Sequence, residues 1–277
     1  MSDNKIPLAG VIGHPIAHSK SPALFSHWFK ELGVRGHYIP MDVMDGDLEQ
    51  VLRTLPKQGF VGCNITIPFK EHALSIADKV SDRATLIGAA NTLSFSEDGS
   101  IYADNTDGHG FIQNLRQGAP DWQPTAGPAA VLGAGGASRA IINALLEEGV
   151  PEILLSNRTR IRAETMKSDF GAKITVVDWV KSGEMLADAA TVVNTTSLGM
   201  VGKAEFRVPL KELSPKAVVN DIVYTPLHTK LLEEAAEIGC RTVDGLGMLL
   251  HQAVPGFERW FGMRPEVTEK ARAAILR

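Results

Sequence analysis

The strongest chemical signal in the chain is the glycine-rich run Gly133-Ala134-Gly135-Gly136-Ala137-Ser138. It follows the apolar run 129–132 and opens a segment with helical spacing, which is the context of a dinucleotide-binding turn. Gly133 permits a tight turn, and Gly135 lets a pyrophosphate approach the helix-start amides that bind anions. Ser138 stands where a third glycine is usual, and an ordinary helix-start turn is the alternative. The context favours dinucleotide binding.

The residues after the next expected strand indicate which dinucleotide. An NAD site would place Asp or Glu there to accept from the ribose 2′-OH, but this chain has Asn157-Arg158-Thr159. Arg162 is four residues beyond Arg158, so the two side chains share a face if the segment is helical. Guanidinium groups suit a 2′-phosphate. A solvated basic helix start is the alternative, yet cations oppose the helix dipole there. The pattern predicts NADP.

Two hydroxyl groups stand at the start of an expected helix near the N-terminus. The run His18-Ser19-Lys20-Ser21-Pro22 places Ser19 and Ser21 there, and a helix N-terminus attracts a carboxylate. Ser21 as the N-cap, with Pro22 at the first helical position, is the simpler interpretation of that residue. It leaves Ser19 unexplained, so both serines are candidate substrate contacts.

Further polar residues follow other expected elements of the first half. Thr66 and Lys70 project beyond the apolar run 60–65, and open α/β sheets bind ligands at the carboxyl ends of their strands. Asn91 and the run 105–108 also stand at element ends, where ordinary turn chemistry is the alternative. A surface lysine that begins a helix is the alternative for Lys70.

Short apolar runs alternate with helix-like segments along the whole chain, which indicates an α/β fold with parallel βαβ units in its second half. The expected strands are 8–13, 37–43, 60–65, 91–95, 100–104, 129–132, 152–156, 174–177, 191–194 and 217–222. The expected helices are 23–32, 47–54, 69–77, 82–87, 108–115, 137–148, 160–168, 227–238 and 266–276.

Composition excludes several classes of protein. The 277 residues carry a formal charge of -4, which does not favour nucleic-acid binding. Two distant cysteines, Cys63 and Cys240, provide neither a disulfide framework nor a thiolate zinc site, and no histidine spacing indicates a metal. No run of 18 apolar residues suggests a membrane span. We therefore expect a cytoplasmic protein without a metal, a membrane partner or a nucleic-acid partner.

In combination, these motifs resemble the shikimate dehydrogenases along nearly the whole chain. The matching runs, in family order, are 18–22, 64–70 (Asn-Ile-Thr-Ile-Pro-Phe-Lys), 88–92, 105–108 (Asn-Thr-Asp-Gly), 133–138, 157–159 and 244–248 (Asp-Gly-Leu-Gly-Met). The resemblance implies two α/β domains facing across a cleft. One is a mostly parallel substrate domain over 1–108, completed by C-terminal helices at 245–277. The other is a Rossmann-like NADP-binding domain over 109–244.

The resemblance also implies an activity, the NADPH-dependent reversible reduction of 3-dehydroshikimate to shikimate in chorismate and aromatic amino acid biosynthesis. The family's catalytic lysine and aspartate fall on Lys70 and Asp107. Reduction of a ketone leaves an alkoxide that must be protonated, and an ammonium can supply that proton while attracting the developing charge. In the reverse direction Lys70 acts as the base, and Asp107 orients it.

Further residues take roles through the resemblance. The substrate contacts are Ser19, Ser21, Thr66, Lys70, Asn91, Asp107, Tyr224 and Gln252. The cofactor contacts are Asp82, Gly133, Ala134, Gly135, Gly136, Ala137, Asn157, Arg158, Thr159, Arg162, Ile222, Gly245 and Met248. Two departures stand out: Thr195 replaces a common alanine in the strand-end loop 194–199, and Phe25-Ser26-His27-Trp28 replaces a frequent His-Asn pair, which bears on first-helix packing or dimer contacts.

Two alternatives stay open from the sequence. A quinate/shikimate dehydrogenase could use NAD or accept the extra hydroxyl of quinate; Arg158 argues against NAD, whereas one hydroxyl of substrate difference cannot be read from residues. A non-catalytic NADP-binding module would be expected to lack the pair Lys70 and Asp107, and both are present. The sequence leaves the oligomeric state open, a homodimer included.

Overall fold

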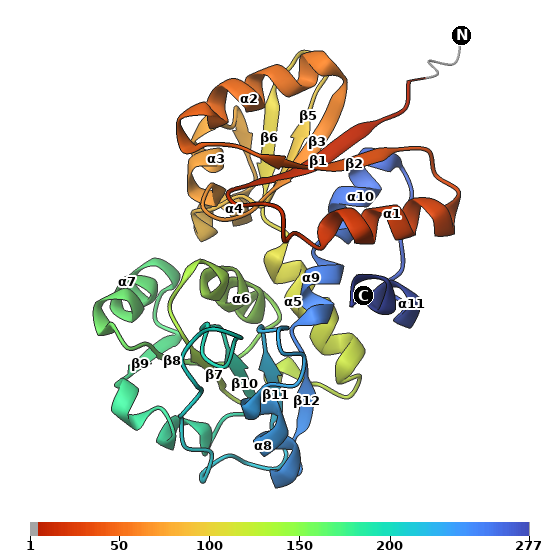
Figure 1. Cartoon of the computed structure of the whole chain (residues 1–277). Coiled ribbons are helices and arrows are strands. Elements are labelled where there is room, and N and C mark those ends of the chain that lie inside the picture. The colour runs from red at the N-terminus through yellow and green to blue at the C-terminus, as the bar shows by residue number, and fades with distance from the viewer. Residues whose placement is uncertain (1–4, 277) are drawn as a thin grey trace. The chain divides into compact units, whose positions relative to one another are not determined.

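The structure is a computed structural model that describes residues 5–276 (Figure 1). The chain forms two compact units. Unit 1 contains the residues through Thr106 together with those from Leu250 onward, and unit 2 is Asp107–Leu249. Across residues 5–276, no helix is long and apolar enough to cross a membrane.

Unit 1 is built on a six-stranded sheet in the order β2-β1-β3-β5-β6-β4. β1 pairs in parallel with β2 and β3, whereas β5 runs antiparallel between β3 and β6. The hairpin from β5 to β6 turns at Gly99, whose φ of 83° favours glycine. The strands are β1 Leu8–Gly13, β2 His37–Asp42, β3 Phe60–Ile65, β4 Lys79–Val80, β5 Thr92–Phe95 and β6 Ile101–Asp104.

Helices cover both faces of this sheet. One face carries α2 (Leu48–Thr54) and α3 (Lys70–Ile76), with one-turn helices η1 (Asp45–Asp47) and η2 (Leu55–Gln58) beside α2. The short α4 (Asp82–Ile87) lies beside β6. The other face carries α1 (Ser21–Leu32) and α10 (Val254–Phe261), and α11 (Glu269–Ile275) packs on α1 (Figure 1). The C-terminal segment is therefore part of unit 1.

The aromatic run in α1 packs against this returning segment. Phe25 and Trp28 are fully buried, and their rings lie 5.4 and 5.5 Å from that of Phe257 in α10. The Trp28 indole also donates to the main-chain oxygen of Glu266. Residues 25–28, which depart from the family pattern, thus form the surface on which the C-terminal helices pack.

Unit 2 is a six-stranded sheet in which every pairing is parallel, in the order β9-β8-β7-β10-β11-β12. Counted from its first strand, this is the 3-2-1-4-5-6 order of a Rossmann-type sheet. The strands are β7 Ala129–Leu132, β8 Ile153–Ser156, β9 Ile174–Val177, β10 Thr191–Asn194, β11 Val218–Asp221 and β12 Arg241–Val243.

The alternation of β7 shows how both faces of this sheet are filled. Ala129 and Val131 face one apolar cluster with α5 and α6, while Ala130 and Leu132 face another with α8. The helices are α5 Asp107–Gly118, η3 Pro124–Ala126, α6 Gly136–Glu147, α7 Arg160–Phe170, η4 Trp179–Lys181, η5 Glu184–Leu186, α8 Lys230–Ile238 and α9 Leu246–His251. The doubly wound arrangement confirms the α/β prediction.

We predict that Gly62→Ala destabilises unit 1. A Cβ at Gly62 would lie 2.0 Å from the Trp260 indole nitrogen and 2.4 Å from the main-chain oxygen of Leu93. The neighbours would have to move, which should lower the free energy of unfolding by about 1–3 kcal/mol. Urea denaturation measures the change. Gly46→Ala is the matched control because an added Cβ there meets nothing within 4 Å; equal stability of the two variants would contradict the packing described.

Candidate functional site

The polar residues of unit 1 gather at one edge of its sheet. β1, β3 and β6 end at this edge, and the antiparallel β5 begins there. The Thr66 amide donates to the main-chain oxygen of Ile12 at the end of β1 (2.9 Å). The Ala90 amide donates to the main-chain oxygen of Lys70 (2.8 Å), so the start of α3 lies beside Asn91.

The Asn91 carboxamide joins three segments that are distant in sequence. Asn91 is 2% exposed, and its Oδ1 accepts from the Thr92 hydroxyl (2.9 Å) and the Thr106 amide (2.8 Å). Its Nδ2 donates to Gln252 Oε1 (3.2 Å), and the Thr106 hydroxyl donates to the Gln252 main-chain oxygen (2.8 Å). The structure therefore places Gln252, which only the family resemblance indicated, beside Asn91.

Ser21 is not the N-cap of the first helix, so that prediction is wrong. The N-cap is Lys20, and Ser21 is the first helical residue, because proline fits the first turn and lets the helix begin before Pro22. The Ser21 amide points to Ser19 Oγ (3.4 Å). The Ser21 side chain lies beside the buried phenol of Tyr38, which donates to Asn64 Oδ1 (2.7 Å). The two serines are neighbours at the helix start, as a shared carboxylate contact requires.

The remaining predicted substrate and catalytic residues are divided between the units. Lys70 is the first residue of α3 in unit 1 and is half-buried. Asp107, buried, is the first residue of α5 and of unit 2. Tyr224 also belongs to unit 2, and burial raises the pKa of its phenol. Asp82, predicted near the cofactor, begins α4 in unit 1 and is exposed.

In unit 2 the glycine run forms a tight turn from β7 into α6. Gly133 has a φ of 110°, which favours glycine, and its amide donates to the Ser156 main-chain oxygen (2.8 Å). Gly135 and Gly136 are exposed, and an added Cβ at either meets nothing within 4 Å. The Ala134 amide is used differently, because it donates to Asn157 Oδ1 (3.1 Å). The open backbone at the start of α6 fits a pyrophosphate.

Two buried hydroxyl groups form hydrogen bonds with the main chain at this turn. Ser138, at the usual third-glycine position, is fully buried and donates to the Gly133 main-chain oxygen (2.7 Å). Thr195, at the position of the common alanine, donates to the main-chain oxygen of Leu132 (2.8 Å). Both departures from the usual residues thus add hydrogen bonds that hold the glycine turn.

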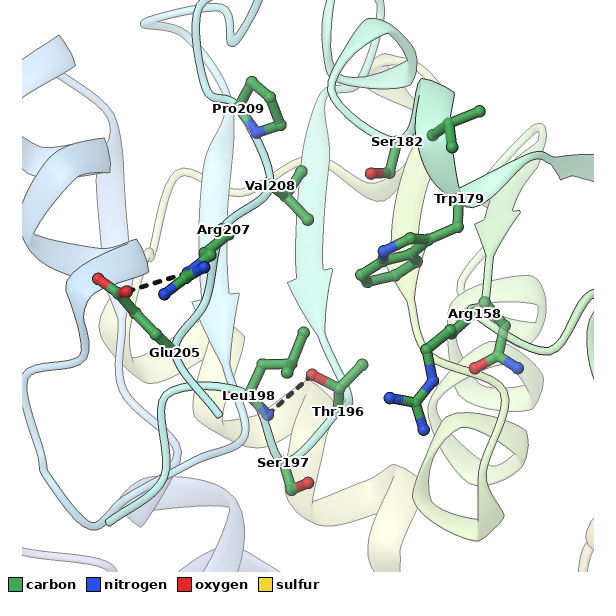
Figure 2. Close-up of a pocket in the computed structure, with 12 residues that line it drawn as sticks. Arg158, Trp179, Ser182, Thr196, Ser197, Leu198, Glu205, Arg207, Val208 and Pro209 are labelled. Carbon is green, nitrogen blue, oxygen red and sulfur yellow. Dashed lines mark hydrogen bonds and ion pairs between the residues drawn. The ribbon is translucent and has the colours of Figure 1, made fainter. Parts of the chain in front are cut away.

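Arg158 lines a cavity of about 580 Å³ at the ends of β8, β9 and β10 (Figure 2). It lies before α7, which begins at Arg160, close to the expected helix 160–168, so the helical face that Arg158 would share with Arg162 does not form. The Asn157 side chain donates to the Thr159 main-chain oxygen (2.8 Å) and holds this stretch outside the helix. The cavity is lined by Asn157, Arg158, Trp179, Val180, Ser182, Thr196, Ser197, Leu198, Glu205, Arg207, Val208 and Pro209.

Most of this lining was missed by sequence reasoning. Trp179, Glu205 and residues 207–209 belong to no recognisable motif, and only the fold brings them to Arg158. The one available signal was position, because Trp179 follows β9 closely, and ligands bind beyond the carboxyl ends of such strands. Across residues 5–276, no group of three or more His, Cys, Asp or Glu side chains is placed to hold a metal ion.

Three predicted cofactor residues gather at the other half of the same sheet edge. A Cβ at Gly245 would lie 2.3 Å from the main-chain oxygen of Ile222, so these two segments are in close contact. Ile222 and Met248 pack against the same apolar cluster. They follow β11 and β12, whereas Arg158 follows β8, so the predicted cofactor residues of unit 2 span both halves of the Rossmann-type sheet.

A buried carboxylate organises the loops beside these residues. Asp221, the last residue of β11, is fully buried and accepts from Asn194 Nδ2 (2.9 Å), the Val223 amide (3.0 Å) and the Thr229 hydroxyl (2.8 Å). Asn194 Oδ1 in turn accepts from Thr196. Desolvation raises the pKa of Asp221 to about 6, although the three donors oppose the shift. One carboxylate therefore fixes the loops after β10 and β11.

A glycine turn after the first strand of a 3-2-1-4-5-6 sheet, joined to a second α/β unit with a polar sheet edge, defines a two-unit protein of the Rossmann dinucleotide-binding class. Residues 11–93 match the family described as shikimate dehydrogenase substrate binding domain, residues 124–224 match shikimate / quinate 5-dehydrogenase, and residues 245–276 match the shikimate 5′-dehydrogenase C-terminal domain. The chain belongs to the shikimate dehydrogenase family.

Individual relatives match along nearly their whole length. The chain is 69% identical over 272 residues to shikimate dehydrogenase (NADP(+)) of Cereibacter sphaeroides, covering 98% of both chains. Shikimate 5-dehydrogenase from Thermus thermophilus, solved with NADP(H) and shikimate, has a TM-score of 0.86 and 37% identity, covering 98% of this chain and 100% of that one. Quinate dehydrogenase from Corynebacterium glutamicum, solved with NAD, has a TM-score of 0.89 and 31% identity, covering 97% and 98%.

Asp221→Asn should change how stability depends on pH. Asp221 has a pKa of about 6 in the fold, against 3.8 for an unperturbed aspartate carboxyl. Between these values the folded state binds more protons than the unfolded chain, so this group makes the protein less stable as the pH rises from about 4 to 6. Asparagine lacks that titration, and the variant should gain roughly 2–3 kcal/mol relative to the parent across this window.

Urea unfolding of parent and variant at several pH values measures this gain. Asp188→Asn, at an exposed position of the same unit, sets the baseline. A stability difference between parent and Asp221→Asn that stays constant with pH would show that the buried carboxyl does not titrate in this range.

Proposed function

We infer that the protein catalyses the NADP-dependent, reversible reduction of 3-dehydroshikimate to shikimate. The observation that carries this inference is the 69% identity, over 98% of both chains, to a shikimate dehydrogenase (NADP(+)). The arrangement in unit 2 agrees with it, because the strand end that would carry an acidic residue for NAD carries Asn157 and Arg158 instead.

The residues present fit the dinucleotide. The exposed backbone at Gly135 and Gly136 would bind the pyrophosphate at the start of α6, and Arg158 would bind the 2′-phosphate. Ile222, Gly245 and Met248 would line the nicotinamide half of the sheet edge. When bound, the nicotinamide supplies or accepts the hydride. The protein's own part is to hold and orient the two reactants and to move the proton.

For the substrate, we propose that the polar edge of unit 1 binds the ring. Ser19 and Ser21 at the start of α1 would hold the carboxylate, and Thr66, Asn91 and Gln252 would bind the ring hydroxyls. A hydroxylated ring needs such partners because each buried polar group left unpaired costs about 1–3 kcal/mol. Tyr224, whose phenol stays protonated, would be a further donor.

Lys70 is the proposed proton donor and Asp107 its partner. An ammonium at the start of α3, next to the Asn91 network, can protonate the ring oxygen on reduction and take the proton back on oxidation. Asp107 follows Thr106 directly, and the hydrogen bonds of Thr106 to Asn91 and Gln252 fix where the chain leaves that network. The carboxylate would orient the ammonium and accept from a substrate hydroxyl.

A second candidate function has its own support. The quinate dehydrogenase solved with NAD has 31% identity, so use of quinate is kept as an alternative, and Arg158 in place of an acidic residue favours NADP.

The cysteines Cys63 and Cys240 are unpaired and buried, which fits the reducing cytoplasm in which we propose the protein works. The oligomeric state, a homodimer included, is left to solution measurements.

Steady-state kinetics with four pairs, shikimate or quinate with NADP or NAD, tests the function directly. We expect the nicotinamide absorbance to rise fastest with shikimate and NADP, because the 2′-phosphate gains the Arg158 contact. Comparable kcat/KM for quinate with NAD would instead favour the second candidate. No turnover with any pair, despite bound NADP, would favour a non-catalytic module.

Lys70→Ala should reduce turnover by roughly 10²–10⁴-fold, the contribution usual for a positioned acid–base group. Binding of NADP should stay within a few-fold of the parent, because the proposed cofactor residues are elsewhere. Stopped assays measure kcat, and equilibrium titration measures NADP affinity. Lys57→Ala, an exposed lysine of the same unit, is the matched control. Unchanged turnover in Lys70→Ala would remove this lysine from the reaction.

A further inference from the structure

An indole ring forms one wall of the cavity that contains Arg158. Trp179 begins η4 shortly after β9 ends at Val177, and it is half-buried. It packs against the apolar cluster beneath the sheet edge and still lines the cavity. Figure 2 shows its ring directed toward the middle of the cavity, on the same side as Arg158. Leu198 and Val208 add apolar surface to the lining.

This wall belongs to one definite half of the sheet. In a Rossmann-type sheet each set of three strands binds one mononucleotide. Arg158 follows the second strand, β8, and Trp179 follows the third, β9, so both lie in the half formed by β7, β8 and β9. The cavity therefore combines a cation with an aromatic face. Both lie in the half of the sheet that would bind the mononucleotide bearing the 2′-phosphate.

The guanidinium of Arg158 and the indole of Trp179 together favour a ligand that has both a phosphate and an aromatic ring. A phosphate on the ribose would be held by Arg158, and the base on the same ribose must then lie within one sugar of it. A purine is flat and aromatic, and aromatic rings favour stacked or edge-to-face contact with one another. The volume of about 580 Å³ is within the range of small-ligand sites.

We propose that the adenine base of the dinucleotide stacks against the indole of Trp179. The proposal rests on the inferred use of NADP and adds a contact that the sequence motifs do not contain. Trp179 thereby contributes affinity for the adenosine half of the cofactor, whichever cofactor is bound. Arg158 provides the preference for the 2′-phosphate. The two contacts are separable because they address different parts of one nucleoside.

Tryptophan emission provides a readout that does not depend on turnover. The other indoles, Trp28, Trp122 and Trp260, are each less than 8% exposed. The probe is 2′,5′-ADP, which carries the adenine and the 2′-phosphate but no nicotinamide. We expect saturable quenching of the parent protein, and loss of most of the quenched amplitude in Trp179→Phe. Trp122→Phe, which removes a buried indole of the same unit, should keep it.

Calorimetric titration measures the contribution of the contact to affinity. Trp179→Leu should weaken binding of 2′,5′-ADP by about 5- to 150-fold, the range for a base stacked on an aromatic side chain. Trp179→Phe should restore most of that affinity. The factor for Trp179→Leu should be similar with ADP, which lacks the 2′-phosphate. Arg158→Ala should weaken 2′,5′-ADP and leave ADP nearly unchanged.

The outcomes separate this proposal from the function on which it rests. If Trp179→Leu binds both probes like the parent, or Trp179→Phe is quenched like the parent, the stacking contact is refuted. If at the same time Arg158→Ala still weakens only 2′,5′-ADP, NADP use stands without it. If the parent binds neither probe, both the contact and the inferred cofactor use are refuted.

Discussion

The carboxamide of Asn91 is the contact on which the polar edge of unit 1 depends. Its oxygen accepts from groups of β5 and of the segment after β6, and its nitrogen donates to the C-terminal segment that returns to unit 1. A buried amide left without partners is costly, so the network favours the one arrangement in which all three segments meet. The edge that we propose for the substrate is thus shaped before any ligand arrives, which lowers the entropy cost of binding.

In unit 2, buried polar side chains likewise hold the glycine turn in place. The turn exposes main-chain amides to a ligand, and such a segment needs support from elsewhere to stay in place. The hydroxyls of Ser138 and Thr195 provide it from beneath. Asp221 does the same for the loops after β10 and β11. In each case a buried polar side chain fixes a main-chain segment that faces the ligand side of the sheet.

Much of this arrangement could be predicted from the sequence. The glycine run and the apolar runs of unit 2 are local signals, and they located β7, α6 and the ligand edge within a residue or two. One error was also local. Lys20, not Ser21, caps α1, because proline permits a helix to start on either side of that position. The condition for a helical face shared by Arg158 and Arg162 is not met, because the Asn157 side chain holds Arg158 outside α7, and periodicity contains no information on such a hydrogen bond.

What could not be predicted depends on contacts between distant segments. Trp179, Glu205 and residues 207–209 meet Arg158 only because β9 and β10 flank β7 and β8 in the sheet. The two-residue β4 has too little pattern of its own to be recognised, whereas α10 was missed although its buried residues Val254, Phe257 and Trp260 recur at helical spacing. The pairing of Lys70 with Asp107 came from family resemblance alone, and it stands as a proposal about two residues of different units.

The packing of α10 on the aromatic residues of α1 has a consequence for folding during synthesis. The Trp28 indole is hydrogen-bonded to Glu266, 238 positions further along the chain. Trp260 packs so closely on Gly62 that no side chain fits there. During synthesis, the first half of the polypeptide emerges from the ribosome before these partners have been made. During that interval Phe25 and Trp28 lack the covering they have in the finished protein, whereas the Rossmann-type unit is one uninterrupted stretch and can complete itself during synthesis. Unit 1 can therefore be completed only after the residues from Leu250 onward have been synthesised.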